Sequence, residues 1–94
     1  MNKFKIAHIR EQGQQMIIVP LGSDFDRQTE NAQREALAAL QAASTSAGLA
    51  GTVVPVWLSG NGMKFIAPRP WLAFFRSLHW NQIMASINKE LTVH

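Results

Sequence analysis

Two runs of apolar residues dominate the pattern along the chain, residues 16–21 and 53–58. Neither run alternates polar with apolar positions, and a strand that is apolar on both sides is typical of a sheet interior covered by other elements. Residues 3–11 precede the first run with a mixed pattern, which favours a half-exposed strand with a slip or bulge near Ala7. Gly13 permits a tight turn between these two segments, so they predict a hairpin.

Between the two apolar runs, the spacing becomes that of an amphipathic helix over about residues 27–46. Its apolar face consists mostly of small side chains three or four positions apart, namely Ala32, Ala36, Ala39, Ala43 and Ala47. Asp26 or Thr29 can cap the beginning, because a side-chain oxygen there accepts a hydrogen bond from a free backbone N–H group. Gly48 can end the helix in the left-handed conformation.

The remainder of the chain predicts a hairpin followed by two helices. Residues 59–62 favour a turn, and residues 63–67 form the partner strand of the second apolar run. A short helix is predicted over about residues 71–78, and a final helix over about residues 81–91. The apolar face of that final helix comprises Trp80, Met84, Ile87 and Leu91.

These elements predict a single α+β domain over residues 1–94, in the order β-β-α-β-β-α-α. A helix between two apolar strands indicates a right-handed βαβ crossover with parallel strands. With the outer strands added antiparallel, we expect a four-stranded mixed sheet with the helices packed on it. Pro20 and Pro55 lie inside the strand runs, and each should mark a bulge or the end of a ladder, because proline has no N–H group to donate.

Composition agrees with one small folded domain. The chain has 94 residues, of which 47% are hydrophobic, enough for a core of its own. It contains no cysteine, which excludes disulfides and cysteine-ligated metals. Its apolar runs fall far short of the roughly 20 residues of a membrane-spanning helix, and the beginning of the chain lacks the apolar stretch of a signal peptide. We therefore expect a soluble, cytoplasmic protein that has no contact with a membrane.

The net charge of +3 arises entirely in the second half of the chain. Five basic and five acidic residues cancel before residue 48, whereas four basic residues and one acidic residue follow. There Lys64, Arg69 and Arg76 alternate with aromatic residues, a combination that can neutralise phosphates and stack bases. The charge is small, however, and the sequence has no known nucleic-acid-binding motif. Nucleic-acid binding is an alternative function and not the favoured one.

The predicted topology indicates a candidate ligand site. The carboxyl ends of parallel strands lie at one edge of a sheet, where open α/β sheets bind their ligands. The loops expected at that edge carry five polar residues, Ser23, Asp24, Asp26, Ser59 and Asn61. Helix capping and turn formation explain the same residue types. Two carboxylates are too few for a specific cation site, so neither a metal nor another cofactor is expected.

Catalytic signatures are absent from the sequence. His8, His79 and His94 form no pair at metal-ligand spacing, and no serine occupies a G-x-S-x-G turn. We assign no catalytic residue. A small enzyme or ligand-binding protein with its site at the loop edge remains an alternative interpretation.

The favoured function is protein interaction. Residues 68–80 hold four large aromatic side chains and two charges, and a domain of this size cannot bury every large side chain. Aromatic residues with arginines beside them are typical of interface centres. The candidate interface is Arg69, Trp71, Phe74, Phe75 and Arg76. We therefore expect a small non-enzymatic interaction module that self-associates, most simply as a homodimer.

Overall fold

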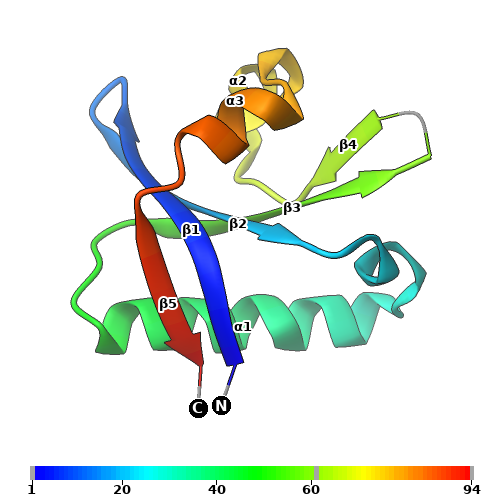
Figure 1. Ribbon diagram of the computed structural model, residues 1–94, viewed down its shortest axis with the longest axis horizontal. Coiled ribbons are helices and arrows are strands. Elements are labelled where there is room, and N and C mark those ends of the chain that lie inside the picture. Colours follow the sequence, from blue (N-terminus) through cyan, green and yellow to red (C-terminus); the bar gives the residue numbers. More distant parts are fainter. Residues whose placement is uncertain (1, 61, 94) are drawn as a thin grey trace.

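The computed structural model describes residues 2–60 and 62–93, which form three layers. A mixed sheet lies in the middle, α1 covers one face, and α2 and α3 cover the other (Figure 1). The strands are β1 (Asn2–Glu11), β2 (Gln14–Leu21), β3 (Thr52–Ser59), β4 (Gly62–Phe65) and β5 (Lys89–Val93). The α-helices are α1 (Glu30–Ser46), α2 (Leu72–Ser77) and α3 (Trp80–Ala85), and the short 3₁₀ helices are η1 (Ser23–Arg27) and η2 (Arg69–Trp71).

The predicted crossover is confirmed. β2 and β3 are adjacent and parallel, with register pairs from Met16–Thr52 to Leu21–Trp57, and α1 joins them. β1 and β4 pair antiparallel on either side of this unit. The prediction of four strands is wrong, because β5 adds a fifth beside β1 and gives the order β4-β3-β2-β1-β5.

The central strands are buried on both faces, as their continuous apolar runs predict. Ile17, Val19 and Val53 face α1 and pack in a cluster with Leu40. Their neighbours in sequence contribute to a second cluster under α2 and α3, which includes Ile18, Val54, Val56, Phe75 and Ile83. Ile6 and Ala7 of β1 are both fully buried for the same reason, since each faces a different covered side. The slip or bulge expected near Ala7 is therefore not present, because regular alternation of β1 between two covered faces explains its mixed pattern.

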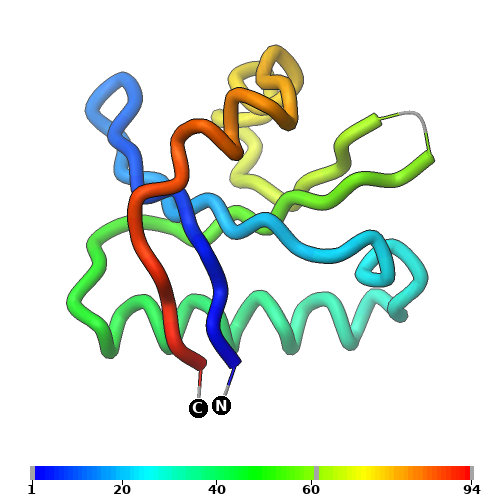
Figure 2. Tube along the Cα trace, in the orientation of Figure 1, coloured from blue at the N-terminus to red at the C-terminus, as the bar shows by residue number. Residues whose placement is uncertain are grey.

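The final helix predicted over residues 81–91 is wrong in its second half. α3 ends at Ala85, and the chain returns as β5 along the first half of β1 (Figure 2). Ile83 and Leu91 therefore lie on opposite faces of the sheet and not on one helix face. Asn88 holds this return in place, because its side-chain amide accepts from the backbone N–H of His8 at 2.9 Å and donates to the His8 carbonyl at 2.9 Å. Pairing with the edge of β1 stabilises residues 89–93 as a strand more than their weak local preference stabilises a helix.

Both ends of α1 are determined locally. Thr29 is the cap, and its hydroxyl accepts from the backbone N–H of Ala32 at 3.1 Å. The helix begins at Glu30, later than predicted, because η1 occupies the preceding residues. At the other end Gly48 has φ 78°, and the N–H of Leu49 donates to the Ser44 carbonyl at 2.9 Å, which is the glycine-ended cap that the sequence predicts.

The prolines lie beside positions where ladders end, as predicted. β2 pairs with β1 only as far as Ile18, two residues before Pro20. β3 pairs with β4 from Val56 onward, directly after Pro55. Pro20 therefore lies outside the β1–β2 pairing, and Pro55 lies outside the β3–β4 pairing.

Gly51 allows the chain to enter β3 against β2. Its φ is 125°, and a Cβ built there would lie 2.6 Å from the Gln15 carbonyl oxygen. We expect Gly51→Ala to lower the free energy of unfolding by about 3 kcal/mol, since strain and a backbone clash combine. Gly48→Ala should cost only about 1 kcal/mol, because its φ is positive but the surrounding space is open. Urea denaturation checks both variants, and equal costs would contradict the close approach.

Ser44 places a hydroxyl inside the protein. Its side chain is fully buried, and its Oγ has no hydrogen-bond partner among residues 2–60 and 62–93. Burying an unpaired hydroxyl costs about 1–3 kcal/mol, and alanine favours a helix more than serine. We expect Ser44→Ala to raise the free energy of unfolding by about 1 kcal/mol. The exposed Ser46→Ala is the control with little change, and a less stable Ser44→Ala protein would show that the hydroxyl is satisfied.

Candidate functional site

Asp26 lies at the centre of a polar cluster at the carboxyl end of β3. Its carboxylate accepts from Trp57 Nε1 at 3.1 Å and from Ser59 Oγ at 2.7 Å. The Lys64 ammonium group of β4 lies 3.2 Å from the same carboxylate. These contacts join η1 to the β3–β4 hairpin, although their residues are widely separated in sequence.

The partners of Asp26 stabilise its charged form. Hydrogen bonds from Ser59, Trp57 and Lys64 lower the pKa of the Asp26 carboxyl from 3.8 to about 2, and partial burial opposes them. The carboxylate is therefore ionised at neutral pH, with three donors already bound to it. This arrangement fixes a loop and leaves little capacity for an added ligand.

Phe25 anchors η1 in a way that the sequence interpretation missed. Its ring is buried and lies 4.8 Å from the Trp57 ring, centre to centre, at an interplanar angle of 67°. The Gln33 side-chain amide donates to the Phe25 carbonyl at 2.8 Å. The sequence does contain one signal for this anchor. Phe25 lies between Asp24 and Asp26, and a turn that is fully exposed to water has no need of a large aromatic side chain.

The structure brings together only part of the predicted ligand set. Asp26 and Ser59 meet directly. Asp24 points elsewhere, forming an exposed ion pair with Arg27, and Ser23 is exposed at the beginning of η1. Asn61 lies outside the described residues. The four described residues of this set therefore do not converge on one site.

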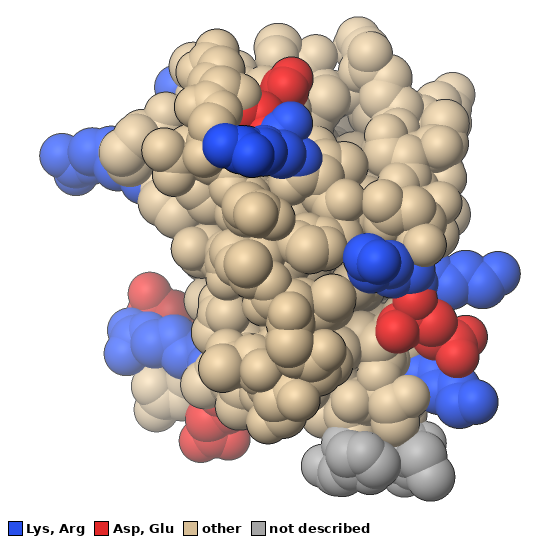
Figure 3. Space-filling model, turned by 90° about the vertical axis from the view of Figure 1, so that its left-hand side faces the viewer, with Lys and Arg blue, Asp and Glu red and all other residues tan. Residues whose placement is uncertain are grey.

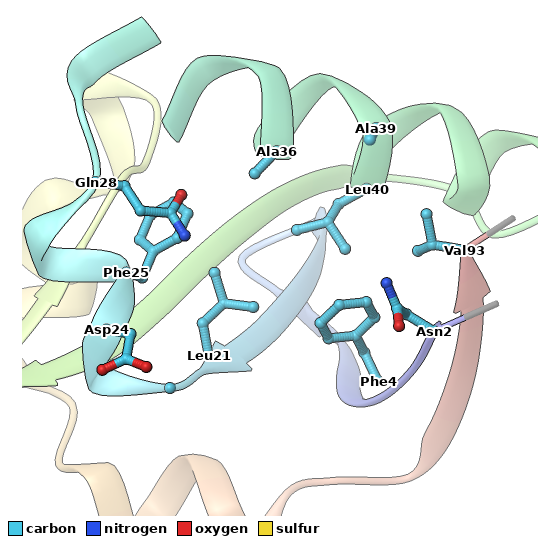
Figure 4. Close-up of a pocket in the computed structure, with 11 residues that line it drawn as sticks. Asn2, Phe4, Leu21, Asp24, Phe25, Gln28, Ala36, Ala39, Leu40 and Val93 are labelled. Carbon is cyan, nitrogen blue, oxygen red and sulfur yellow. The ribbon is translucent and has the colours of Figure 1, made fainter. Parts of the chain in front are cut away.

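A cavity of about 340 Å³ lies beside the end of β2, on the α1 face of the sheet. Figure 4 shows the apolar side chains of Phe4, Leu21 and Leu40 between its two ends. Asp24 and Gln28 lie toward one end, and Asn2 lies toward the other. Its lining is completed by Gly22, Phe25, Ala36, Ala39 and Val93. Of the loop-edge residues predicted from the sequence, Asp24 alone lines this cavity.

A second depression of about 530 Å³ separates α1 from β5. Small residues of α1 and the Ala47 that follows it form one wall, and β5 forms the other. The lining residues are Ala39, Ala42, Ala43, Ser46 and Ala47, with Glu90, Leu91, Thr92 and Val93 opposite. We call this depression the α1–β5 groove. It adjoins the cavity, because Ala39 and Val93 line both.

The residues of the predicted interface occupy different environments. Phe75 is fully buried, and the centre of its ring lies 5.5 Å from that of Phe65 and 5.3 Å from that of Phe74. It is therefore a core residue of the single chain and not an exposed interface residue, because α2 needs a large side chain to cover the sheet. Trp71 and Phe74 are partly buried against the same cluster, whereas Arg69 and Arg76 are exposed.

A metal-binding group and a membrane-spanning helix are both absent from the described residues. No group of three or more His, Asp or Glu side chains could hold a metal ion within residues 2–60 and 62–93. None of the helices in these ranges is both long enough and apolar enough to cross a bilayer. Of the three basic residues that the sequence offers for phosphate binding, Lys64, Arg69 and Arg76, the first forms an ion pair with Asp26.

Comparison with known proteins adds no functional information, since the chain matches no known protein family, no curated protein and no solved structure.

The low pKa of Asp26 predicts a specific acid dependence. A carboxyl group whose pKa is lower in the folded protein than in the unfolded chain stabilises the folded protein at every pH above the unfolded pKa. For Asp26 this contribution is complete above about pH 4 and is lost as the pH falls from about 4 to about 2. We expect Asp26→Asn to be less stable than the unmodified protein at pH 7. The difference should shrink as the pH falls toward 2, as measured by urea denaturation at several pH values.

Asp24→Asn is the matched control. Its side chain is 84% exposed and pairs with the similarly exposed Arg27, so loss of the charge should change stability little. A difference between Asp26→Asn and the unmodified protein that stays constant from pH 7 to pH 2 would contradict the assigned role.

Proposed function

We propose that the protein is a non-enzymatic interaction module that self-associates through β5 and the α1–β5 groove. The observation that carries this proposal is an edge strand beside a groove lined by small residues. β5 is the last strand in the sheet order, with β1 as its one neighbour among the described residues. An edge strand presents backbone groups that another strand can pair with, which is a common mode of protein association.

The groove favours close approach of a partner. Its α1 wall consists of alanines and Ser46, which leave room for side chains of a second copy. Glu90 is the one charged residue in its lining, and the chain carries no charge from Ala36 to Met63. Figure 3 shows one face of the molecule, on which much of the middle is uncharged. Depletion of charge is a feature of interface centres.

The charges on β5 are compatible with antiparallel pairing of two copies. If the strands pair about Leu91, Lys89 lies opposite Val93 of the partner subunit, and Glu90 lies opposite Thr92 of the partner subunit. No two like charges then lie directly opposite each other. The two-fold axis of such a pairing is perpendicular to the sheet, so both α1 helices would lie on the same face with their grooves toward each other.

The segment predicted from the sequence provides an alternative surface for the same function. Trp71 and Phe74 are partly buried, and Arg69 and Arg76 are exposed beside them. Phe75 has no part in that surface, because it is fully buried. The β5 edge is the stronger candidate, since it combines the last strand of the described sheet with an adjoining groove.

Sedimentation measurements on a glutamate variant test this proposal. We expect a concentration-dependent dimer for the unmodified protein at micromolar to millimolar concentration. Ala42→Glu places a carboxylate in the groove and should weaken dimerisation at least roughly tenfold, because a buried unpaired charge is costly. Ala38→Glu is the matched control, being an exposed alanine of α1 that does not line the groove.

The outcomes separate the two surfaces. An unmodified protein that stays monomeric throughout this range contradicts self-association. A dimer that survives Ala42→Glu but dissociates in an Arg76→Glu protein would move the interface to the aromatic segment. Circular dichroism checks that each variant remains folded.

A further inference from the structure

The cavity beside the end of β2 exists because α1 presents small side chains above it. Ala36 and Ala39 face a floor that includes Phe4 and Leu21, and their methyl groups do not reach far enough to fill the space. A volume of about 340 Å³ lies within the range of roughly 300–1,000 Å³ that is typical of small-molecule sites. A larger side chain on α1 could fill such a gap, and filling cavities commonly increases stability.

The lining indicates the chemistry of the molecule that would fit. Two phenylalanines contribute to an otherwise aliphatic wall, which favours a flat ring through aromatic contacts. Polar groups are few and lie toward the ends, where the Gln28 and Asn2 amides can donate or accept a hydrogen bond. Asp24 also lines one end, but its carboxylate is exposed and pairs with Arg27. An apolar body with a small number of fixed polar contacts is the usual pattern of a ligand site.

The position of the cavity agrees with its chemistry. Leu21 is the carboxyl end of a strand in the parallel pair, and the chain then leaves the sheet through Gly22 into η1. This is the edge at which open α/β sheets bind ligands. Asp26 and Ser59 bond to each other near that edge and do not line the cavity.

We propose that this cavity binds a small, uncharged ring compound that carries one hydrogen-bond donor, with the ring between Phe4, Leu21 and Leu40 and the donor directed to the Gln28 side-chain carbonyl. The site does not depend on self-association, because α1, β1, β2, η1 and β5 of a single chain supply its lining. It would give the module a small-molecule ligand in addition to a protein partner.

The fluorescent probe N-phenyl-1-naphthylamine tests the proposal, since it is uncharged and combines apolar rings with one N–H donor. Its emission should rise on binding, with one probe per chain. Ala36→Leu extends a side chain into the cavity and should weaken binding at least roughly tenfold, while Ala38→Leu, an exposed position outside the lining, should leave it unchanged. Gln28→Ala should weaken binding severalfold, because alanine offers no acceptor for the N–H group of the probe.

Each result decides the proposal. It is overturned if the unmodified protein gives no enhancement, if Ala36→Leu binds as well as the unmodified protein, or if Ala38→Leu loses binding equally. Ala39→Leu is a second filling variant in case Ala36→Leu unfolds, with thermal melting as the check on folding. Ala42→Glu must retain probe binding even where it abolishes the dimer, so failure of self-association and failure of the ligand site remain distinguishable.

Discussion

The two parallel strands at the centre of the sheet are apolar on both sides, and most of the structure serves to cover them. A strand with Ile17 and Val19 on one side and Ile18 on the other cannot leave either face in water without losing its main stabilisation. The long helix α1 covers one face, and the short helices α2 and α3 cover the other. Phe75 and Ile83 are fully buried for this purpose. The large aromatic side chains of residues 68–80 therefore pack mainly in or against the core.

The two covering layers differ in how completely they fill the space. On the α2 and α3 side, large rings close the gap, with the Phe75 ring packed against those of Phe65 and Phe74. On the α1 side, alanines dominate, so the helix lies over the sheet without filling the space toward its β5 edge. The cavity and the α1–β5 groove both follow from this difference. The proposed functions therefore lie on the face that has the smaller side chains.

Asp26 shows how a polar residue at a ligand-binding edge can have a structural role. Its position after a parallel strand is where ligands are expected, yet Trp57, Ser59 and Lys64 already use its oxygens. Residue type and position alone cannot distinguish these outcomes, because a carboxylate serves both equally well. Partners that come from a distant hairpin decide between them.

Local features of the fold could be predicted from the sequence alone. The helix α1, its glycine-ended cap and the turns of both hairpins depend on residues close together in sequence, and periodicity and turn chemistry report such contacts directly. The crossover joins partners 36 positions apart, from Met16–Thr52 to Leu21–Trp57, but it follows from the order of a strand, a helix and a strand. The strand β5, the cavity and the partners of Asp26 could not be predicted in this way. Asn88 and His8 are separated by 80 positions, and the cavity is enclosed by segments from both ends of the chain. Tertiary packing decided these features, because the energy of a long-range contact depends on which surfaces the folded chain brings together and not on the local pattern.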